Sequence, residues 1–361
     1  MHIVLDARKY LDFGIGTYIQ NLVAEIAQRE KLTLLVSPED APRIDAIPGV
    51  VLKISSAGKY SVKELFSIAS DANALAADLF HAPHYTVPFG LRMPCVTTIH
   101  DILHIRGKKY FSPLQQGYAR AVAGHACRAS AAIIVDSQFT RDELLDVFQV
   151  EEKKIHVIHL GVSPLYAQHP ADEEIRNFKA MRGLAHQAIL YTGSLKPHKN
   201  VPTLLAAFAH LKNHADVQLV FSGESIKAHT QYWQMITALG IERRVIDIGM
   251  ISRREHVLEY HAATVVVLQS HYEGFGFSVL EAMTAGTPAI GARAASIPEV
   301  MGEGGVLFNP YSSNDLSTEL ARVLDDPSHR SGMIERGFRN AAQFSWKKCA
   351  EETLSVYRSL Q

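Results

Sequence analysis

Short runs of apolar and β-branched residues alternate with longer helical patterns along all 361 residues of the chain. Strand candidates in the first half are HIVLD (2–6), LTLLV (32–36), VLKI (51–54), DLFHA (78–82), CVTTIH (95–100) and AAIIVD (131–136). After IHVIHLGV (155–162) come AILYTG (188–193), VQLVFSG (217–223), RVIDIG (244–249), TVVVLQS (264–270), TPAIGA (287–292) and GVLFNP (305–310). This regular alternation predicts parallel sheets covered by helices on both faces. We therefore expect an α/β protein with two Rossmann-like, doubly wound domains.

The length suits roughly two domains of ordinary size. The segment 163–174 is polar, contains two prolines and lacks periodicity, so we place a linker there. It separates an N-terminal domain (1–165) from a C-terminal domain (175–344). We expect residues 345–361, an amphipathic stretch, to pack back on the N-terminal domain. Ligands of doubly wound sheets bind at the carboxyl ends of the strands, which predicts a central cleft that both domains face.

Composition excludes several classes of protein. The formal net charge of −1 gives no electrostatic reason to expect a nucleic-acid partner. The three cysteines form no CxxC pair, which favours a reducing compartment over a disulfide framework or a zinc site. We find no signal-peptide pattern and no apolar window of about 18 residues. The expected location is the cytoplasm, with at most peripheral contact to the inner membrane face.

The strongest motif is HYEGFGFSVLEAMTAGTPAI (271–290), which follows a strand and opens a helix. We call residues 271–277 the glycine turn. Gly274 and Gly276 let backbone amides approach a phosphate at the start of the helix. Glu273 and Glu281 flank the turn and can accept hydrogen bonds from sugar and ribose hydroxyls. The alternative is an ordinary turn followed by a helix with a solvated Glu281.

A second motif, YTGSLKPHKN (191–200), also lies between a strand and a helix. We call residues 194–200 the lysine turn. Lys199, and in a lesser role Lys196, can neutralise a diphosphate leaving group. The alternative is a solvated basic turn.

Two further motifs lie in the N-terminal half. In DFGIGTYIQNLV (12–23), only Gly14 and Gly16 fit a dinucleotide fingerprint, which is weak evidence. In TTIHDILHI (97–105), His100 ends a strand. The histidines at 81, 84 and 104 have no zinc-like spacing, so we expect no metal site. His81 and His84 belong either to a structured loop or to an acceptor contact.

Residues 273–281 resemble the E-x7-E motif of retaining GT-B glycosyltransferases, above all glycosyltransferase family 4. The resemblance implies that Glu273 contacts the transferred sugar and Glu281 the ribose of a nucleotide-sugar donor. It also implies that the amides of Phe275, Gly276 and Phe277 hold sugar hydroxyls and the distal phosphate.

The lysine turn resembles the basic loop with which this family grips the donor phosphates. The resemblance places Ser194 and Lys199 at the donor, whereas His198 occupies the usual arginine position. It also implies that the Gly16 amide meets the diphosphate and that His100 lies beside the donor sugar. The stretch 246–263 resembles the segment that clasps the base through backbone groups.

GIGTY, HDILH and GSLKPHKN are most similar to bacterial mannosyltransferases of surface-polysaccharide assembly. The resemblance implies GDP-mannose as the donor, with UDP-glucose or another UDP-hexose as the alternative. It implies a saccharide or lipid-linked oligosaccharide acceptor. Residues 106–120 are basic with interleaved aromatics and form either a membrane contact or a solvated helix face. No DxD motif is present, so we expect no metal ion and no cofactor besides the donor.

Three other functions are considered. An NAD-dependent oxidoreductase needs a third glycine, which Ile19 replaces, and leaves the lysine and glycine turns unexplained. A nucleotide-sugar 2-epimerase of the same fold would use the donor without an acceptor. A non-catalytic sugar-binding protein would not need both carboxylates and the lysine.

Overall fold

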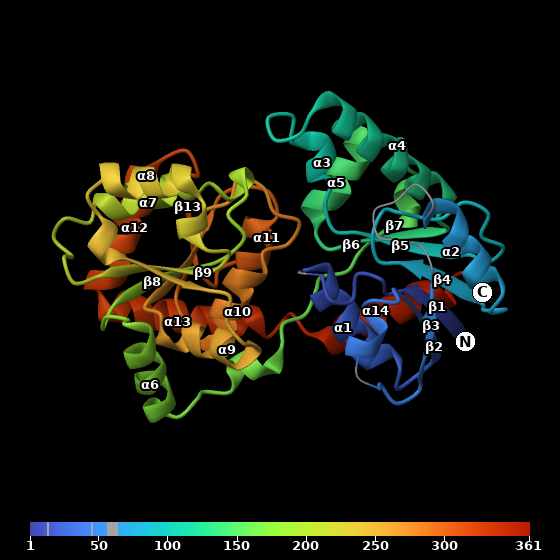
Figure 1. Cartoon of the computed structure of the whole chain (residues 1–361), viewed down its shortest axis with the longest axis horizontal. Coiled ribbons are helices and arrows are strands. Elements are labelled where there is room, and N and C mark those ends of the chain that lie inside the picture. The colour runs from blue at the N-terminus through green and yellow to red at the C-terminus, as the bar shows by residue number, and fades with distance from the viewer. Residues whose placement is uncertain (13, 45, 56–63) are drawn as a thin grey trace. The chain divides into compact units, whose positions relative to one another are not determined.

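The computed structural model describes residues 1–12, 14–44, 46–55 and 64–361. The chain divides into two compact units (Figure 1). The first unit contains Met1–Gly161 and Ser345–Gln361, and the second contains Val162–Phe344. None of the described helices is both long and apolar enough to span a bilayer.

The first unit is built on a seven-stranded parallel sheet with the order β3-β2-β1-β4-β5-β6-β7. Its strands are β1 (His2–Asp6), β2 (Lys31–Val36), β3 (Val50–Ile54), β4 (Leu79–Ala82), β5 (Cys95–Ile99), β6 (Ala132–Val135) and β7 (Ile155–Val157). The central strands are buried along their length, as expected for a sheet covered on both faces.

Among the described residues of this unit, six α-helices accompany the sheet, and one of them comes from the far end of the sequence. They are α1 (Ile15–Ile26), α2 (Glu64–Asn73), α3 (Leu103–Arg106), α4 (Pro113–Ala129), α5 (Gln138–Val147) and α14 (Trp346–Arg358). Helix α14 packs against α1. The Tyr357 hydroxyl of α14 is hydrogen-bonded to Nδ1 of His81 on β4, so α14 completes the core of the first unit.

The second unit contains a six-stranded parallel sheet with the order β10-β9-β8-β11-β12-β13. Its strands are β8 (Ala188–Gly193), β9 (Gln218–Gly223), β10 (Val245–Gly249), β11 (Val265–Leu268), β12 (Ala289–Ala292) and β13 (Val306–Phe308). Its helices are α6 (Asp172–Arg182), α7 (Val201–Ala209), α8 (Thr230–Ala238), α9 (Arg253–Ala262), α10 (Phe277–Ala285), α11 (Ile297–Met301), α12 (Ser313–Asp325) and α13 (Pro327–Ala341).

The predicted pair of doubly wound parallel sheets is confirmed, with strand ends shifted by a few residues. Segment 163–174 differs from the expected linker, because it is folded into the second unit. It holds a 3₁₀ turn (Pro164–Ala167) and the beginning of α6. The Tyr166 side chain is buried and its ring packs edge-on against Tyr260 of α9, which anchors the segment.

Candidate functional site

The sheet of the second unit changes its direction of growth between β8 and β11, which are neighbours. In doubly wound sheets, ligands bind beyond the carboxyl ends of the strands at such a switch point. The lysine turn leaves β8 there, and the glycine turn follows β11. The two strongest sequence motifs are therefore brought to the same edge of one sheet.

Hydrogen bonds join these two loops directly. The Gln269 side-chain amide donates to the carbonyl of Lys199 at 2.8 Å. The backbone amide of His271 donates to the carbonyl of His198, also at 2.8 Å. Asn200, in a left-handed conformation that asparagine tolerates, donates to the carbonyl of Gln269 at 3.1 Å. The protein alone thus fixes the position of the lysine turn.

Lys199 and Glu273 form an ion pair at the centre of this edge. Lys199 Nζ lies 2.7 Å from Glu273 Oε1 and 2.9 Å from Oε2. Only 20% of the lysine side chain and 14% of the glutamate side chain are exposed. Such a half-buried pair presents a fixed positive and a fixed negative group next to each other.

The glycine turn has a backbone that only glycine adopts easily. Gly276 has a φ of 115°, and a Cβ there would also approach Leu268 Cδ2 to 3.4 Å. The Ser296 hydroxyl lies 2.9 Å from the carbonyl oxygens of both Glu273 and Phe275, which clamps the turn. Helix α10 begins directly afterwards and has no side-chain cap. The positive end of the helix dipole therefore lies at the glycine turn, where it favours an anionic or hydroxyl ligand.

Three other predicted donor contacts lie around these turns. The Phe275 ring is buried and packs edge-on against Phe277 and Phe344, so this side chain is part of the core. Phe277 is the first residue of α10. Ser194 is partly exposed, and its carbonyl accepts a hydrogen bond from the hydroxyl of Tyr191.

Glu281 lies on α10 and is half-buried. Its Oε2 accepts a hydrogen bond of 2.6 Å from the hydroxyl of Tyr260, a buried residue of α9. Helices α9 and α10 are neighbours in the second unit (Figure 1). Tyr260 therefore orients the Glu281 carboxylate, and the hydroxyl of Tyr166 also lies near this carboxylate.

Glu259, next to Tyr260, is a buried acid that the sequence did not predict. Only 2% of the residue is exposed, although the hydroxyls of Thr192 and Ser222 lie near its carboxyl group. Burial raises the pKa of Glu259 to about 8, and the neighbouring charge of Glu281 adds to this rise.

Glu259 predicts a loss of stability as the pH rises. An unfolded glutamate ionises near pH 4.5, whereas folded Glu259 keeps its proton up to about pH 8. The free energy of unfolding should fall by about 5 kcal/mol between these values, because the unfolded state releases its proton first. In the wild type, the urea concentration at the unfolding midpoint should therefore fall as the pH rises. In Glu259→Gln this pH dependence should disappear.

Glu255, one helical turn earlier, provides the matched control. Arg182 and the Ser252 cap lower the pKa of Glu255 to about 2, so it is ionised in both states over the same pH range. In Glu255→Gln the urea midpoint should fall with pH as steeply as in the wild type. An equally steep fall in Glu259→Gln would contradict the raised pKa of Glu259.

In the first unit, His100 follows β5 and Asp136 follows β6. Because Ile99 and Val135 are register partners, the two following residues lie side by side. His100 Nδ1 is 2.6 Å from Asp136 Oδ2. Burial lowers the pKa of His100, but the charge and hydrogen bond of Asp136 outweigh this effect and raise it. His100 thus carries a proton more readily than an ordinary histidine.

The predicted contact between the Gly16 amide and the donor diphosphate stays a prediction, and the structure shows a packing role for this glycine. Its amide donates a hydrogen bond of 2.8 Å to the carbonyl of Asp12, and the residue is buried in α1. A Cβ at this position would lie 2.6 Å from the carbonyl oxygen of Tyr10. Close packing against the preceding loop therefore requires a glycine at this position.

The histidines near His100 have separate roles. His81 is fully buried, and burial lowers its pKa to about 3. Its Nε2 is hydrogen-bonded to Thr98 at 2.8 Å, so His81 belongs to the core. His84 is partly exposed, and His104 is exposed and bonded to the Tyr85 hydroxyl. Within the described ranges, no group of three His, Cys, Asp or Glu residues could hold a metal ion.

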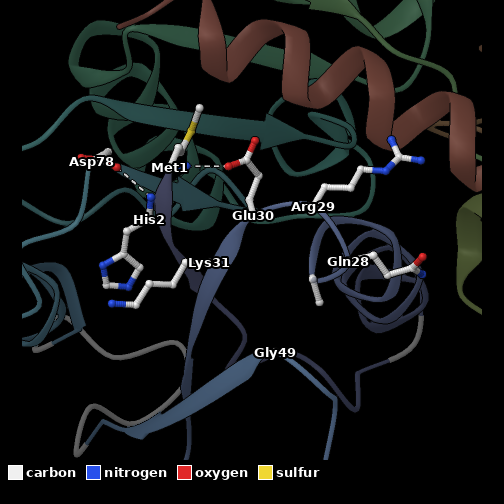
Figure 2. A pocket seen from close by; sticks show the side chains of 9 residues that line it. Met1, His2, Gln28, Arg29, Glu30, Lys31, Gly49 and Asp78 are labelled. Carbon is white, nitrogen blue, oxygen red and sulfur yellow. Dashed lines mark hydrogen bonds and ion pairs between the residues drawn. The ribbon is translucent and has the colours of Figure 1, made fainter.

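A hollow of about 680 Å³ lies at the amino-terminal edge of the strands in the first sheet (Figure 2), whereas His100 lies at the carboxyl-terminal edge. The hollow surrounds the amino ends of β1 and β2. Both of its carboxylates already have partners: Glu30 contacts the Met1 amine at 2.6 Å, and Asp78 accepts a hydrogen bond of 2.7 Å from the His2 backbone amide. Because ligands of such sheets bind at the carboxyl edge, we do not place the functional site in this hollow.

Sequence reasoning missed the partners that orient the predicted residues. Asp136 could have been found, since it ends the strand AAIIVD beside the strand that ends at His100. The hydrogen bonds of Tyr260 to Glu281 and of Ser296 to the glycine turn could not be predicted, because they join elements that are distant in sequence.

Comparison with known proteins gives family matches for both halves. Residues 14–164 match the family described as Glycosyltransferase Family 4, and residues 175–340 match Glycosyl transferases group 1. O-antigen chain mannosyltransferase B of Escherichia coli is 27% identical over 372 residues, which cover 98% of this chain and 97% of the relative. MMP alpha-(1->4)-mannosyltransferase of Mycolicibacterium hassiacum is 31% identical over 62% of this chain and 53% of the relative.

Solved structures share the fold at lower identity. Anabaena Alr3699/HepE, in complex with UDP and glucose, has a TM-score of 0.81 and 21% identity, and the match covers 99% of this chain and all (100%) of that one. WaaG, a glycosyltransferase involved in lipopolysaccharide biosynthesis, has a TM-score of 0.80 and 15% identity over 98% of this chain and 99% of that one.

Proposed function

Because this chain belongs to glycosyltransferase family 4 and has the GT-B fold, we propose that it transfers mannose from GDP-mannose, with retention of configuration. The acceptor is a hydroxyl of a saccharide or of a lipid-linked oligosaccharide. One observation carries the proposal: the Lys199–Glu273 pair stands beside the start of α10 at the switch point of the sheet. The names of two relatives support mannose as the sugar.

The ion pair matches the charges that develop when the donor breaks apart. The bond between sugar C1 and the diphosphate oxygen breaks, and its electron pair stays on the phosphate. Lys199 then faces the negative leaving group, and Glu273 faces the positive sugar ring. Groups fixed in advance opposite both charges stabilise the transition state more than the ground state.

The acceptor hydroxyl attacks C1 from the face that the diphosphate leaves, which retains the configuration. Its proton passes to an oxygen of the departing phosphate, so the protein supplies no covalent nucleophile. His100, whose proton Asp136 stabilises, is placed beside the donor sugar in this proposal. The amides of Phe275, Gly276 and Phe277, together with Ser194, hold the distal phosphate and sugar hydroxyls. The reaction as proposed uses no metal ion or other cofactor.

Glu281 is the proposed ribose contact, and its replacement should weaken donor binding. In Glu281→Ala the hydrogen bonds to the ribose diol are lost, and we expect the donor KM to rise about ten-fold or more with a smaller change in kcat. Steady-state kinetics with varied donor concentration measure both values. Tyr260→Phe, which removes only the hydroxyl that orients Glu281, should give a smaller rise. An unchanged donor KM in Glu281→Ala would contradict ribose recognition.

Two alternatives use the same site. A UDP-sugar donor is supported by Alr3699/HepE, which was solved with UDP and with UDP-glucose. A nucleotide-sugar 2-epimerase would convert its substrate without an acceptor. Thermal-shift measurements with GDP-mannose, UDP-glucose and UDP-N-acetylglucosamine select the donor. Analysis of the products with and without an added oligosaccharide then separates transfer from epimerisation. If no nucleotide sugar raises the melting temperature, the proposal is wrong.

We also propose that the first unit contacts anionic membranes through the beginning of α4. Leu114 is 84% exposed and Tyr118 is 50% exposed, one turn apart on this helix. Lys108 and Lys109 are exposed just before it. Wild-type protein should sediment with vesicles of phosphatidylserine and phosphatidylcholine, and Lys108→Glu/Lys109→Glu should not. Equal sedimentation with pure phosphatidylcholine would contradict the electrostatic contact.

A further inference from the structure

A connected group of side chains beside Glu281 has no role in the mechanism above. Its centre is the imidazole of His256, in the first turns of α9. His256 Nδ1 shares a hydrogen bond of 2.8 Å with the hydroxyl of Tyr166. Its Nε2 lies 3.4 Å from Thr192 Oγ1 and 3.3 Å from Glu259 Oε1. The protein itself therefore engages both ring nitrogens.

Aromatic neighbours fix the orientation of this ring. The His256 and Tyr260 rings have centroids 5.3 Å apart at an interplanar angle of 88°, and the Tyr166 ring lies 5.9 Å away at 73°. Even so, 31% of the His256 side chain is exposed, against 1% of Glu259. The side chain is therefore held in place by its neighbours and is still accessible from solvent. A flat ring held in one orientation is a platform on which a nucleobase can stack.

The location of His256 fits the nucleoside end of the donor. Thr192 is the next-to-last residue of β8, which leads into the turn that carries Lys199. On the other side, Tyr260 contacts the His256 ring and donates to Glu281. A donor with its diphosphate at Lys199 and its ribose at Glu281 brings the attached base to the neighbourhood of His256.

The buried side chain of Glu259 contacts the His256 ring at Nε2. Within the part of the chain that the structure describes, neither of its carboxyl oxygens makes a hydrogen bond of good geometry. Burying a polar group in this way is costly, and a leucine would fill the same place in an α-helix without that cost. The His256 imidazole lies in contact with this carboxyl group, with Nε2 3.3 Å from Oε1.

We propose that His256 stacks against the base of the donor nucleotide, and that Glu259 is the positioning residue that holds the imidazole in this orientation. The inference rests on the proposed function and adds a base contact made by a side chain. It predicts that these two residues affect only the base-dependent part of donor binding.

Isothermal titration calorimetry with GDP, UDP and inorganic pyrophosphate tests this on the full-length protein. His256→Ala should weaken the binding of GDP, or of UDP if that is the donor nucleotide, about ten-fold, because a base–ring stack is lost. His256→Phe keeps a flat ring and should restore most of the affinity. Glu259→Leu should behave like His256→Ala, and Glu259→Gln like the wild type. Pyrophosphate has no base, so its affinity should stay the same in all four variants.

His210→Ala, at an exposed histidine after α7, is the control and should bind all three ligands like the wild type. Unchanged nucleotide affinity in His256→Ala overturns the inference, and so does an equal loss of nucleotide and pyrophosphate binding, which would indicate a structural role. A wild-type protein that binds neither GDP nor UDP overturns the proposed function itself. The two failures are therefore distinguishable.

Discussion

Lys199→Ala should lower kcat by about 10²–10³-fold, the largest effect we expect from any single substitution. Hydrogen bonds to the carbonyl groups of His198 and Lys199 hold the lysine turn at the switch point, and this turn places Lys199 Nζ there. Without it, the negative charge that grows on the leaving diphosphate has lost its nearest counter-charge. Single-turnover measurements with saturating donor report the chemical step directly.

Two variants make this result specific. Lys196→Ala removes an exposed lysine from the same turn that is not bonded to Glu273, and we expect a change of no more than about three-fold. Lys199→Arg keeps the positive charge but replaces the compact ammonium group with a planar guanidinium, and its kcat should lie between those of Lys199→Ala and the wild type. A kcat close to the wild-type value in Lys199→Ala would exclude the proposed phosphate role.

Glu273→Gln should lower kcat by about 10²-fold and leave the affinity for free GDP nearly unchanged. The amide is almost the same size as the carboxylate but carries no charge to stabilise a positive sugar ring. The free nucleotide lacks the sugar, so its binding should not depend on this side chain. Kinetics and calorimetry on the same preparation separate the two effects.

A double-mutant cycle provides the control for Glu273. Because Lys199 and Glu273 are in contact, the fold-loss in kcat of Lys199→Ala/Glu273→Gln should be much smaller than the product of the fold-losses of the two single variants. Additive losses would show that the two residues act independently. A large loss of GDP affinity in Glu273→Gln would count against its assignment to the sugar.

Much of the fold could be predicted because hydrophobic periodicity reports burial. The strands of both sheets are short apolar runs, and the lysine and glycine turns stand where such runs end. Periodicity has no information on contacts between distant elements, however. The bond between Tyr260 and Glu281 joins two helices, and Glu259 occupies an apolar face where the pattern favours leucine. Gly16 shows a second limit, because close packing against Tyr10 requires the same glycine that a phosphate contact would need, and the sequence alone does not separate the two.

The position of α14 has a consequence for how the protein is made. The chain leaves the first unit after Gly161, forms the whole second unit, and returns at Ser345. During synthesis on the ribosome, the second unit can therefore finish folding while the first still lacks the helix that carries Tyr357. We expect the nascent N-terminal sheet to need protection from aggregation until residues 345–361 emerge. A stop codon just before Trp346 should thus harm the solubility of the first unit far more than that of the second.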